Sequence, residues 1–296
     1  MITSTTAVGG RPQSRDLLQK LRSNDTRTPD RLRAHYEIEK RLAERLLSAS
    51  KEERRFLYSR LYDELFRSVP DHPQLTKRED PVEQAKATAR RATLLSPFLT
   101  RRSTFLEVGP GDCALALRIA GMVRKVYAID VSTEITKGNE LPGNFELILS
   151  DGSSIPVPPG SVDVAYSDQL MEHLHPQDAT DQLRNIVRAL KPGGVYICIT
   201  PNRISGPHDI SMYFTEQPTG FHLHEYTTTE LVHMFKRSGF SKVRGLVPVG
   251  GKAIIMPAFV TMVVEAILQH LPRKQARSIA RLAPLRAILN RVIATV

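Results

Sequence analysis

Residues 105–122, FLEVGPGDCALALRIAGM, decide the fold: an apolar run enters a Gly-Pro-Gly turn and an amphipathic run leaves it. A buried strand, a glycine turn and a helix in this order are typical of the first βα unit of an open α/β sheet. The spacing Gly109-x-Gly111-x-x-Ala114 also satisfies the loose pattern of a dinucleotide-binding loop. The ligand of this turn therefore has to be inferred from the residues around it.

Downstream of the turn, strand-like apolar runs alternate with helical runs. Strands are expected at 104–108, 125–130, 145–150, 162–167 and 194–200, and shorter apolar segments follow at 242–249 and 252–260. Helices are expected at 113–122, at 177–190 and after the capping pair Thr227 and Glu230. This alternation predicts an α/β fold with a Rossmann-like, doubly wound and mostly parallel sheet of seven strands.

The sequence predicts further segments on both sides of this unit. We expect a disordered lead over residues 1–30 and an N-terminal helical extension over 31–100, with a capping box at Ser50 and Glu53 and a third helix capped by Asp80. The ligand-binding domain is expected over 101–256. Residues 257–296 read as a basic, amphipathic C-terminal helical tail.

Composition favours a globular protein that stays in a reducing compartment. The 296 residues carry a net charge of +10, and the two cysteines, Cys113 and Cys198, fall far apart on predicted core elements. The most apolar stretch, 253–271, is interrupted by Pro257, Glu265 and His270, and the first 30 residues lack the apolar region of a secretory signal. We therefore expect a cytoplasmic protein, with peripheral contact at the inner membrane surface as a further option.

The charges beside the glycine turn argue against a dinucleotide. Glu107 lies two residues before Gly109, and Asp112 directly follows Gly111. Two carboxylates would repel a pyrophosphate, whereas they suit a ligand that presents an ammonium or a sulfonium. An NAD-dependent dehydrogenase is therefore disfavoured.

Polar residues also follow the later strands. Asp130 ends the second strand about 20 residues past the turn, where a carboxylate can accept hydrogen bonds from ribose hydroxyls. Asp151 and Gly152 end the third strand, where the Asp151 side chain could accept from an adenine amino group. Ser167, Asp168 and Gln169 end the fourth. Because ligands of open α/β sheets bind at the carboxyl ends of the strands, these residues are candidates for one site.

The segments FLEVGPGDC, VYAIDVS, LSDGSSIPVPPGSVDVAYSDQLMEHL and ALKPGGVYICITPN resemble the successive motifs of class I S-adenosylmethionine-dependent methyltransferases, over roughly residues 91–249. HLHEYTTTELVHMFKRSGF is similar to the late segment of the small-molecule branch, which includes ubiquinone- and natural-product-type enzymes. The resemblance implies S-adenosyl-L-methionine as cofactor. It implies that the methionine part of the cofactor is surrounded by Glu107, Gly109 and Gly111, and that its ribose is held by Asp130. It also implies that the adenine is flanked by Asp151 and Gly152, and that the cofactor near the substrate is lined by Ser167 to Gln169. Pro110, Asp112 and Val131 complete the implied cofactor-binding set.

Candidate substrate contacts are His173 and His222, which match positions that recur in the family's motifs. A helix over 168–174 would place Gln169, Glu172 and His173 on neighbouring faces. Two alternatives stay open. Both histidines could have core or capping roles, and the enzyme could act by bringing the reactants together without a general base. The two His-x-His pairs, 173/175 and 222/224, invite a metal interpretation, but the cysteines are on core elements and we expect no metal site.

The tail and the net charge leave several partners open. No acidic residue follows Glu265, so the arginine-rich tail is either a solvated basic face or a surface for a membrane that carries a lipid-linked substrate. The favoured function is methyl transfer to a small-molecule, saccharide or lipid-like acceptor, with oxygen as the methylated atom. The alternatives are an RNA methyltransferase and a non-catalytic cofactor-binding interaction module. The sequence shows no RRM-like, KH-like or zinc-ribbon pattern, which argues against RNA, and no DNA partner is expected.

Overall fold

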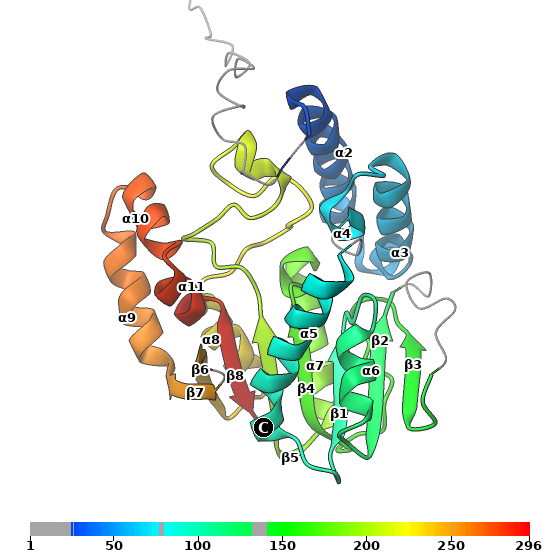
Figure 1. The fold of residues 1–296 in the computed structure, drawn as a ribbon. Helices are drawn as coiled ribbons and strands as arrows, with labels where there is room; N and C mark the ends of the chain where they lie inside the picture. The colour runs from blue at the N-terminus through cyan, green and yellow to red at the C-terminus, as the bar shows by residue number, and fades with distance from the viewer. Residues whose placement is uncertain (1–24, 26, 77–79, 132–140, 251) are drawn as a thin grey trace, which may run out of the picture.

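The computed structural model describes residues 25, 27–76, 80–131, 141–250 and 252–296, and within them the chain forms a mixed sheet flanked by helices (Figure 1). The sheet has eight strands in the order β3-β2-β1-β4-β5-β8-β6-β7. Their bounds are β1 Thr104–Val108, β2 Lys125–Asp130, β3 Phe145–Leu149, β4 Val162–Asp168, β5 Leu190–Ile199, β6 Lys242–Val249, β7 Lys252–Pro257 and β8 Arg291–Thr295. The expected strands are all present within a few residues.

The sheet is mostly parallel, as predicted. β1 pairs in parallel with β2 and β4, β2 with β3, and β4 with β5. β8 is antiparallel to both β5 and β6, so β6 runs in the same direction as the first five strands. β7 is an antiparallel edge strand beside β6. The order reverses between β1 and β4, which creates the crevice where open α/β sheets bind their ligands.

Helices cover both faces of the sheet. Because successive side chains of a strand point to opposite faces, the sheet contributes to two hydrophobic cores, one on each face. On one face Phe105 packs with α5 and α6, and on the other Leu106 packs with α3 and α7. The helices are α2 Pro29–Ser48, α3 Lys51–Ser68, α4 Pro73–Thr76, α5 Pro81–Leu95, α6 Ala114–Ala120, α7 Pro176–Ala189, α8 Thr228–Ser238, α9 Ala258–Gln269, α10 Arg273–Ala280 and α11 Ala283–Leu289. The predicted capping boxes of α3 and α8 are both formed.

The N-terminal helices lie over the end of the sheet at which the parallel strands finish (Figure 1). Arg54 of α3 makes a buried, two-pronged ion pair with Asp178 of α7, with N–O distances of 2.7 and 2.9 Å. This pair fixes the extension to the sheet's own helices. The expected disordered lead lies outside the described residues, except for residue 25 and residues 27–30, of which Pro29 and Asp30 begin α2.

The C-terminal segment differs from the expected helical tail. Three helices, α9 to α11, are present, but the last residues form β8 between β5 and β6, so the sheet has eight strands rather than seven. Val292, Ile293 and Ala294 are buried on both faces of the sheet, which stabilises an extended conformation that their sequence neighbourhood does not signal. Among the described residues, no helix combines the length and the apolar composition that crossing a bilayer requires.

Candidate cofactor and acceptor site

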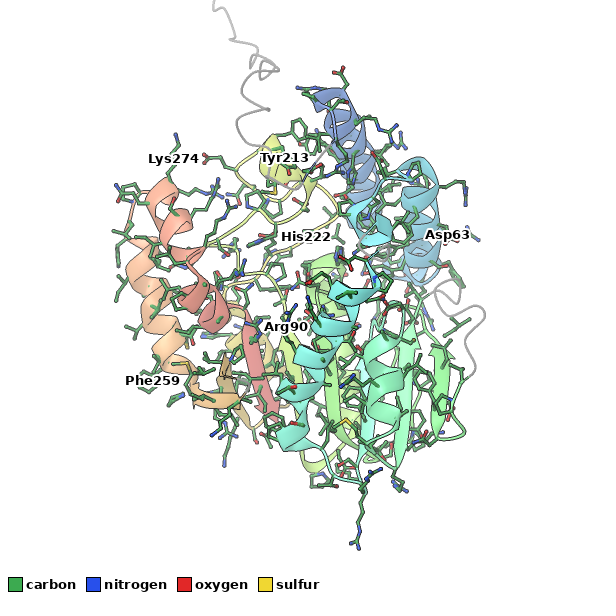
Figure 2. The ribbon with its side chains drawn as sticks, in the orientation of Figure 1. Asp63, Arg90, Tyr213, His222, Phe259 and Lys274 are labelled. Carbon is green, nitrogen blue, oxygen red and sulfur yellow. The ribbon has the colours of Figure 1, made fainter. Side chains whose placement is uncertain are left out.

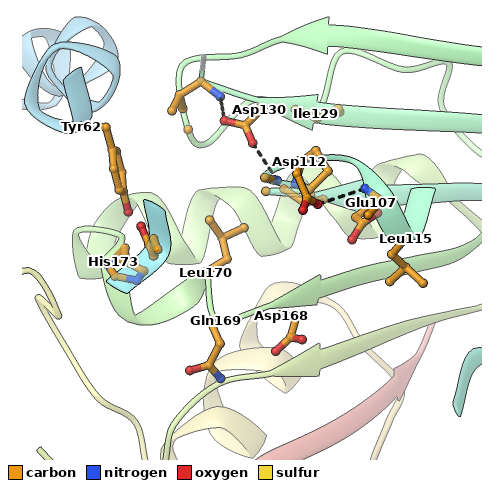
Figure 3. A pocket seen from close by; sticks show the side chains of 18 of the residues that line it. Tyr62, Glu107, Asp112, Leu115, Ile129, Asp130, Asp168, Gln169, Leu170 and His173 are labelled. Atoms are coloured by element: carbon orange, nitrogen blue, oxygen red, sulfur yellow. Dashed lines mark hydrogen bonds between the residues drawn. The ribbon is translucent and has the colours of Figure 1, made fainter. Parts of the chain in front are cut away.

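A cavity of about 580 Å³ lies at the carboxyl ends of β1, β2 and β4, beneath α3 and α5 (Figure 3). It contains most of the residues that the sequence analysis singled out. Those that line it are Glu107, Gly109, Pro110, Gly111, Asp112, Asp130, Val131, Gly152, Asp168, Gln169 and His173. One cavity thus brings together residues that lie up to 66 positions apart in the chain.

The glycine turn is shaped for a ligand that approaches the backbone. Gly109 and Gly111 have φ angles of +69° and +57°, which L side chains rarely adopt. A Cβ on Gly111 would meet no atom within 4 Å among the described residues, so its open side faces the cavity. Cys113, which precedes α6, is also left-handed with φ 58°. The turn therefore leaves room beside the backbone at the start of α6.

Glu107 is a buried carboxylate with one unsatisfied oxygen. Its Oε2 has no hydrogen-bond partner among the described residues. Burial raises the pKa of Glu107 to about 8, although the nearby charge of Arg91 acts in the opposite direction. A buried polar atom without a partner costs free energy unless a ligand satisfies it. An ammonium group in the cavity would do so, and this is the fit expected for the amino-acid part of S-adenosylmethionine.

The other acidic residues of the turn are held by the backbone. Asp130 accepts hydrogen bonds from Val131 N at 2.7 Å and from Gly111 N at 3.4 Å, so it connects the end of β2 to the turn (Figure 3). Asp112 accepts from Ala114 N at 3.0 Å, at the start of α6, and from the Gln84 side chain of α5. Both carboxylates border the cavity in fixed orientations.

Three predicted site residues are not among the described residues that line the cavity. The Asp151 carboxylate accepts from Ser153 N, Ser154 N and Arg55, so it organises its own turn rather than pointing at a ligand, while Gly152 does reach the cavity. Ser167 is buried, and its hydroxyl hydrogen-bonds to Tyr196 at 2.6 Å. His222 lies behind His173, with a ring-centroid distance of 4.8 Å.

The cavity continues past the turn to an aromatic end. His173 lies there beside Tyr62 of α3, and Leu170 lies between them and the glycine turn (Figure 3). Phe66 of α3 also lines the cavity. The His173 Nδ1 is 2.9 Å from the carbonyl oxygen of Phe221. Because a carbonyl oxygen only accepts, Nδ1 carries the proton and Nε2 keeps a lone pair. Burial and the charge of His222 lower the pKa of His173 to about 3, so its imidazole is neutral at physiological pH.

The expected helix over 168–174 is not formed. Gln169 has a φ of +57°, which ends β4 sharply, and only Met171–His173 form a short 3₁₀ turn. The i,i+4 relation between Gln169 and His173 therefore does not apply. Instead the turn directs Glu172 into the core, towards Thr200, and His173 towards the cavity.

The N-terminal helices bring further residues to the cavity that no sequence motif indicated. These are Tyr58, Tyr62, Asp63 and Phe66 of α3, Gln74 of α4, and Glu83, Gln84, Ala87, Thr88, Arg90 and Arg91 of α5. The one hint in the sequence is the glycine at position 152. A Cβ there would lie 2.9 Å from the Tyr58 ring. Glycine at this position permits the close approach of α3, but only the folded structure shows that Tyr58 is the neighbouring residue.

Comparison with known proteins agrees with this geometry. Residues 106–198 match the family model described as "Methyltransferase domain". A relative from Mycolicibacterium smegmatis, named "Probable S-adenosylmethionine-dependent methyltransferase", is 32% identical over 139 residues, 46% of this chain and 51% of the relative. A relative with the same description from Mycobacterium tuberculosis is 31% identical over 150 residues, 50% of this chain and 52% of that one. The chain thus spans about half the length of these curated relatives.

A solved structure shares the fold. A chain of the complex between the Haloferax volcanii Trm112 methyltransferase activator and a methyltransferase matches with a TM-score of 0.51 at 14% identity, over 75% of this chain and 95% of that chain. Fold, acid-lined turn and family match together define the class of protein: the chain carries a class I S-adenosylmethionine-dependent methyltransferase domain. The predicted class and its cofactor, S-adenosyl-L-methionine, are thereby confirmed, whereas the small-molecule branch stays a prediction.

Proposed function

We propose that the whole protein transfers the methyl group of S-adenosylmethionine to an oxygen atom of a small-molecule, saccharide or lipid-like acceptor. The observation that carries this proposal is the cavity itself. At one end it offers a buried carboxyl oxygen that no described residue satisfies, beside an open glycine turn, and at the other an aromatic wall with the His173 imidazole, whose Nδ1 is hydrogen-bonded to Phe221. A cationic cofactor and a hydroxyl-bearing acceptor fit these two ends.

In this proposal the cofactor supplies the electrophile and the chain supplies position. Glu107 accepts from the cofactor's ammonium group, and Asp130 accepts from the ribose hydroxyls. The acceptor oxygen attacks the methyl carbon, so one C–O bond forms and one C–S bond breaks. The sulfonium becomes a neutral thioether, and the hydroxyl proton leaves for solvent. Tyr62, Phe66 and Leu170 would exclude water from the reacting atoms.

His173 has the right tautomer to orient a hydroxyl. Its Nε2 lone pair can accept a hydrogen bond from an O–H group, because Nδ1 is already committed to the Phe221 carbonyl oxygen. The low pKa of its imidazole makes it a weak proton acceptor. His173 is therefore assigned the role of holding the acceptor hydroxyl, and another factor has to lower the pKa of that hydroxyl.

Calorimetry with S-adenosylhomocysteine and with NAD tests the cofactor side. We expect binding of S-adenosylhomocysteine and none of NAD, with Asp130→Ala weakening binding about tenfold or more, since charge-assisted hydrogen bonds contribute roughly 1.5–3 kcal/mol each. Asp63→Ala is not a suitable control, because Asp63 is half-buried and lines the cavity. Asp30→Ala is a suitable control, because Asp30 lies on the exposed first turn of α2. Heat with NAD alone would reject the proposal.

A surface on the C-terminal segment supports a lipid-like acceptor. Phe259, Val263 and Ile267 form a stripe along α9 and are 64, 52 and 60% exposed. A helix that is apolar on its outward face is typical of contact with another apolar phase. Figure 2 shows Phe259 on the outer flank of the molecule, with Lys274 farther along the same flank.

The charges around this stripe favour an anionic bilayer. Lys252, Arg273, Lys274 and Arg286 are exposed, whereas Glu265, after which no acidic residue occurs, is buried and hydrogen-bonded. Exposed apolar side chains flanked by cations suit peripheral binding to anionic headgroups. We therefore assign this surface to the face of a membrane that would hold the acceptor.

Cosedimentation with vesicles tests this surface. We expect the protein to bind phosphatidylglycerol vesicles and not phosphatidylcholine vesicles, and the double variant Phe259→Ser, Ile267→Ser to lose binding. Phe56→Ser is the matched control, because Phe56 is 68% exposed on α3. Equal sedimentation of the parent and the α9 variant would reject the membrane surface and leave the methyl-transfer proposal intact.

A further inference from the structure

Three side chains converge behind the acceptor end of the cavity: Glu172, His173 and His222, here called the Glu172 cluster. One ligand atom from each lies within 4.8 Å of the other two. Glu172 and His173 come from the turn after β4, whereas His222 comes from the loop before α8. The fold thus brings together two imidazoles and one carboxylate that are separated by about 50 residues in the sequence.

Among the described residues, each of the two rings is hydrogen-bonded through its Nδ1 atom, which leaves Nε2 as the atom that could bind a ligand. His173 Nδ1 donates to the carbonyl oxygen of Phe221 at 2.9 Å, and His222 Nδ1 lies 2.8 Å from the Glu225 carboxylate. In the neutral His173 ring this places the lone pair on Nε2. Although burial acts in the opposite direction, the Glu225 carboxylate raises the pKa of His222 to about 9, so His222 has to release its Nε2 proton when it binds an ion. Histidines that bind metals are oriented by such donation to a carbonyl or a carboxylate.

Glu172 supplies an independent sign of an absent partner. Its Oε2 accepts from the Thr200 hydroxyl at 2.9 Å, but its Oε1 is buried and has no hydrogen-bond partner within the described ranges. Glu225 also has an unsatisfied buried oxygen among these residues, and Asp209 adds a partly buried carboxylate near His222 that accepts from Ser211 N and Gly220 N. The surroundings of the cluster are therefore rich in negative charge that a cation would compensate.

A second His–Glu–His group shows what a complete hydrogen-bond network looks like. In the group of His35, Glu39 and His72, Arg27 lies 2.7 Å from His35 Nδ1, and an arginine can only donate. Gln74 N donates to His72 Nδ1 at 3.2 Å. The Nε2 atoms of both rings therefore carry protons and donate to Glu39. That group is satisfied internally, and the Glu172 cluster is not.

We propose that Glu172, His173 and His222 bind a first-row divalent metal ion of the zinc type, at the acceptor end of the cavity. Two imidazoles and one carboxylate are a ligand set that such ions accept, and three protein ligands leave a position open. His173 lines the cavity, so an ion bound to its Nε2 would take the place that the acceptor hydroxyl has in the metal-free proposal above, and the hydroxyl would bind the ion instead. Resting on the proposed methyl transfer, the ion would bind the acceptor hydroxyl and lower its pKa.

The sequence alone led us to expect no metal site, because the only candidates there were the His-x-His pairs 173/175 and 222/224. The proposed site differs from both pairs. The structure separates the members of each pair. His175 caps α7 by accepting from Gln177 N, and His224 lies beside Glu230. The ligand set combines one histidine from each pair with Glu172, a grouping that spacing alone does not reveal.

Metal titration of the tag-free full chain tests the site. We expect one Zn²⁺ to bind by calorimetry, and one Co²⁺ to give a visible absorption band from ligand coordination that Zn²⁺ abolishes. Glu172→Gln and His222→Ala should each weaken Zn²⁺ binding by about 100-fold or more. His224→Ala is the matched control and should bind like the parent. A second control, His72→Ala, tests whether the His35 group is the true site.

The outcomes separate this inference from the proposed function. S-adenosylhomocysteine binding, measured without metal, should be unchanged within about twofold in Glu172→Gln, which also shows that the variant is folded. If the parent binds S-adenosylhomocysteine but Zn²⁺ and Co²⁺ bind no more tightly than to Glu172→Gln, the metal site is rejected alone and His222 serves as the compensating cation. If S-adenosylhomocysteine does not bind, the proposed function is rejected instead.

Discussion

Glu107 shows how a residue type at one position determines the chemistry of a site. A carboxyl group at the end of β1 is buried because the strand is covered on both faces, and burial raises its pKa to about 8. The free site therefore stabilises the protonated form at pH 7. A bound ammonium would favour the ionised form, because an opposite charge lowers the pKa of a buried acid.

This coupling predicts how cofactor binding depends on pH. Binding of S-adenosylhomocysteine should release a proton from Glu107 at pH 7, so affinity should rise from pH 6 towards pH 8 and level off above it. Calorimetric heats should accordingly vary with the ionisation heat of the buffer. Glu107→Gln should weaken binding by about 10- to 100-fold, equivalent to roughly 1.5–3 kcal/mol, and remove the buffer dependence. The exposed Glu52→Gln should change neither; a buffer-dependent heat that persists in Glu107→Gln would assign the proton to another group.

At the scale of elements, the contact between α3 and α7 determines whether the N-terminal helices belong to the site. The two helices share a buried pair, Arg54–Asp178, and Tyr58 donates to the same carboxylate at 2.7 Å. The same helices also share an exposed pair, Lys51–Asp181. Breaking a buried pair leaves an uncompensated charge, whereas exposed pairs contribute little.

We therefore predict different effects from two substitutions at this contact. Arg54→Ala should lower the free energy of unfolding by about 3–5 kcal/mol. Lys51→Ala should lower it by at most about 1 kcal/mol. Urea denaturation followed by circular dichroism measures both. Because Tyr58 and Tyr62 line the cavity, Arg54→Ala should also weaken S-adenosylhomocysteine binding. Equal stabilities of the two variants would show that α3 is only loosely attached.

At the scale of the whole molecule, the C-terminal strand connects the sheet's two parts. β8 pairs with β5 on one side and with β6 on the other, so within the described part of the chain β6 and β7 are hydrogen-bonded to the other strands of the sheet through residues 291–295. The segments 242–257 and 291–295 thus depend on each other. The tail is part of the core, although α9 to α11 lie on the surface.

Removing this connection should abolish the folded state. A chain that ends at Asn290, or the variant Ile293→Asp, should lose cooperative thermal unfolding, because either change leaves β5 and β6 unpaired or buries a charge in the sheet. Leu282→Asp is the control, since Leu282 is 57% exposed. A chain ending at Asn290 that unfolds like the parent would mean that β8 contributes nothing. The membrane surface is for this reason tested by substitutions on α9 rather than by truncation.

The sequence by itself determined the βα succession and the chemistry of the turn. Gly109, Gly111, Glu107 and Asp130 could be interpreted locally because strand period, glycine spacing and charge are properties of neighbouring residues. The capping boxes of α3 and α8 are local in the same sense, and both are present. These features led to the fold, the family and the cofactor.

Only the tertiary structure decided which distant side chains meet. The role of Val292 to Ala294 as a strand depends on β5 and β6, which are distant in sequence and supply its hydrogen bonds from both sides. The Glu172 cluster requires the loop before α8 to pack against the turn after β4, and the cavity requires α3 to lie over Gly152. Such contacts follow from the packing of the whole chain, and no local periodicity encodes them.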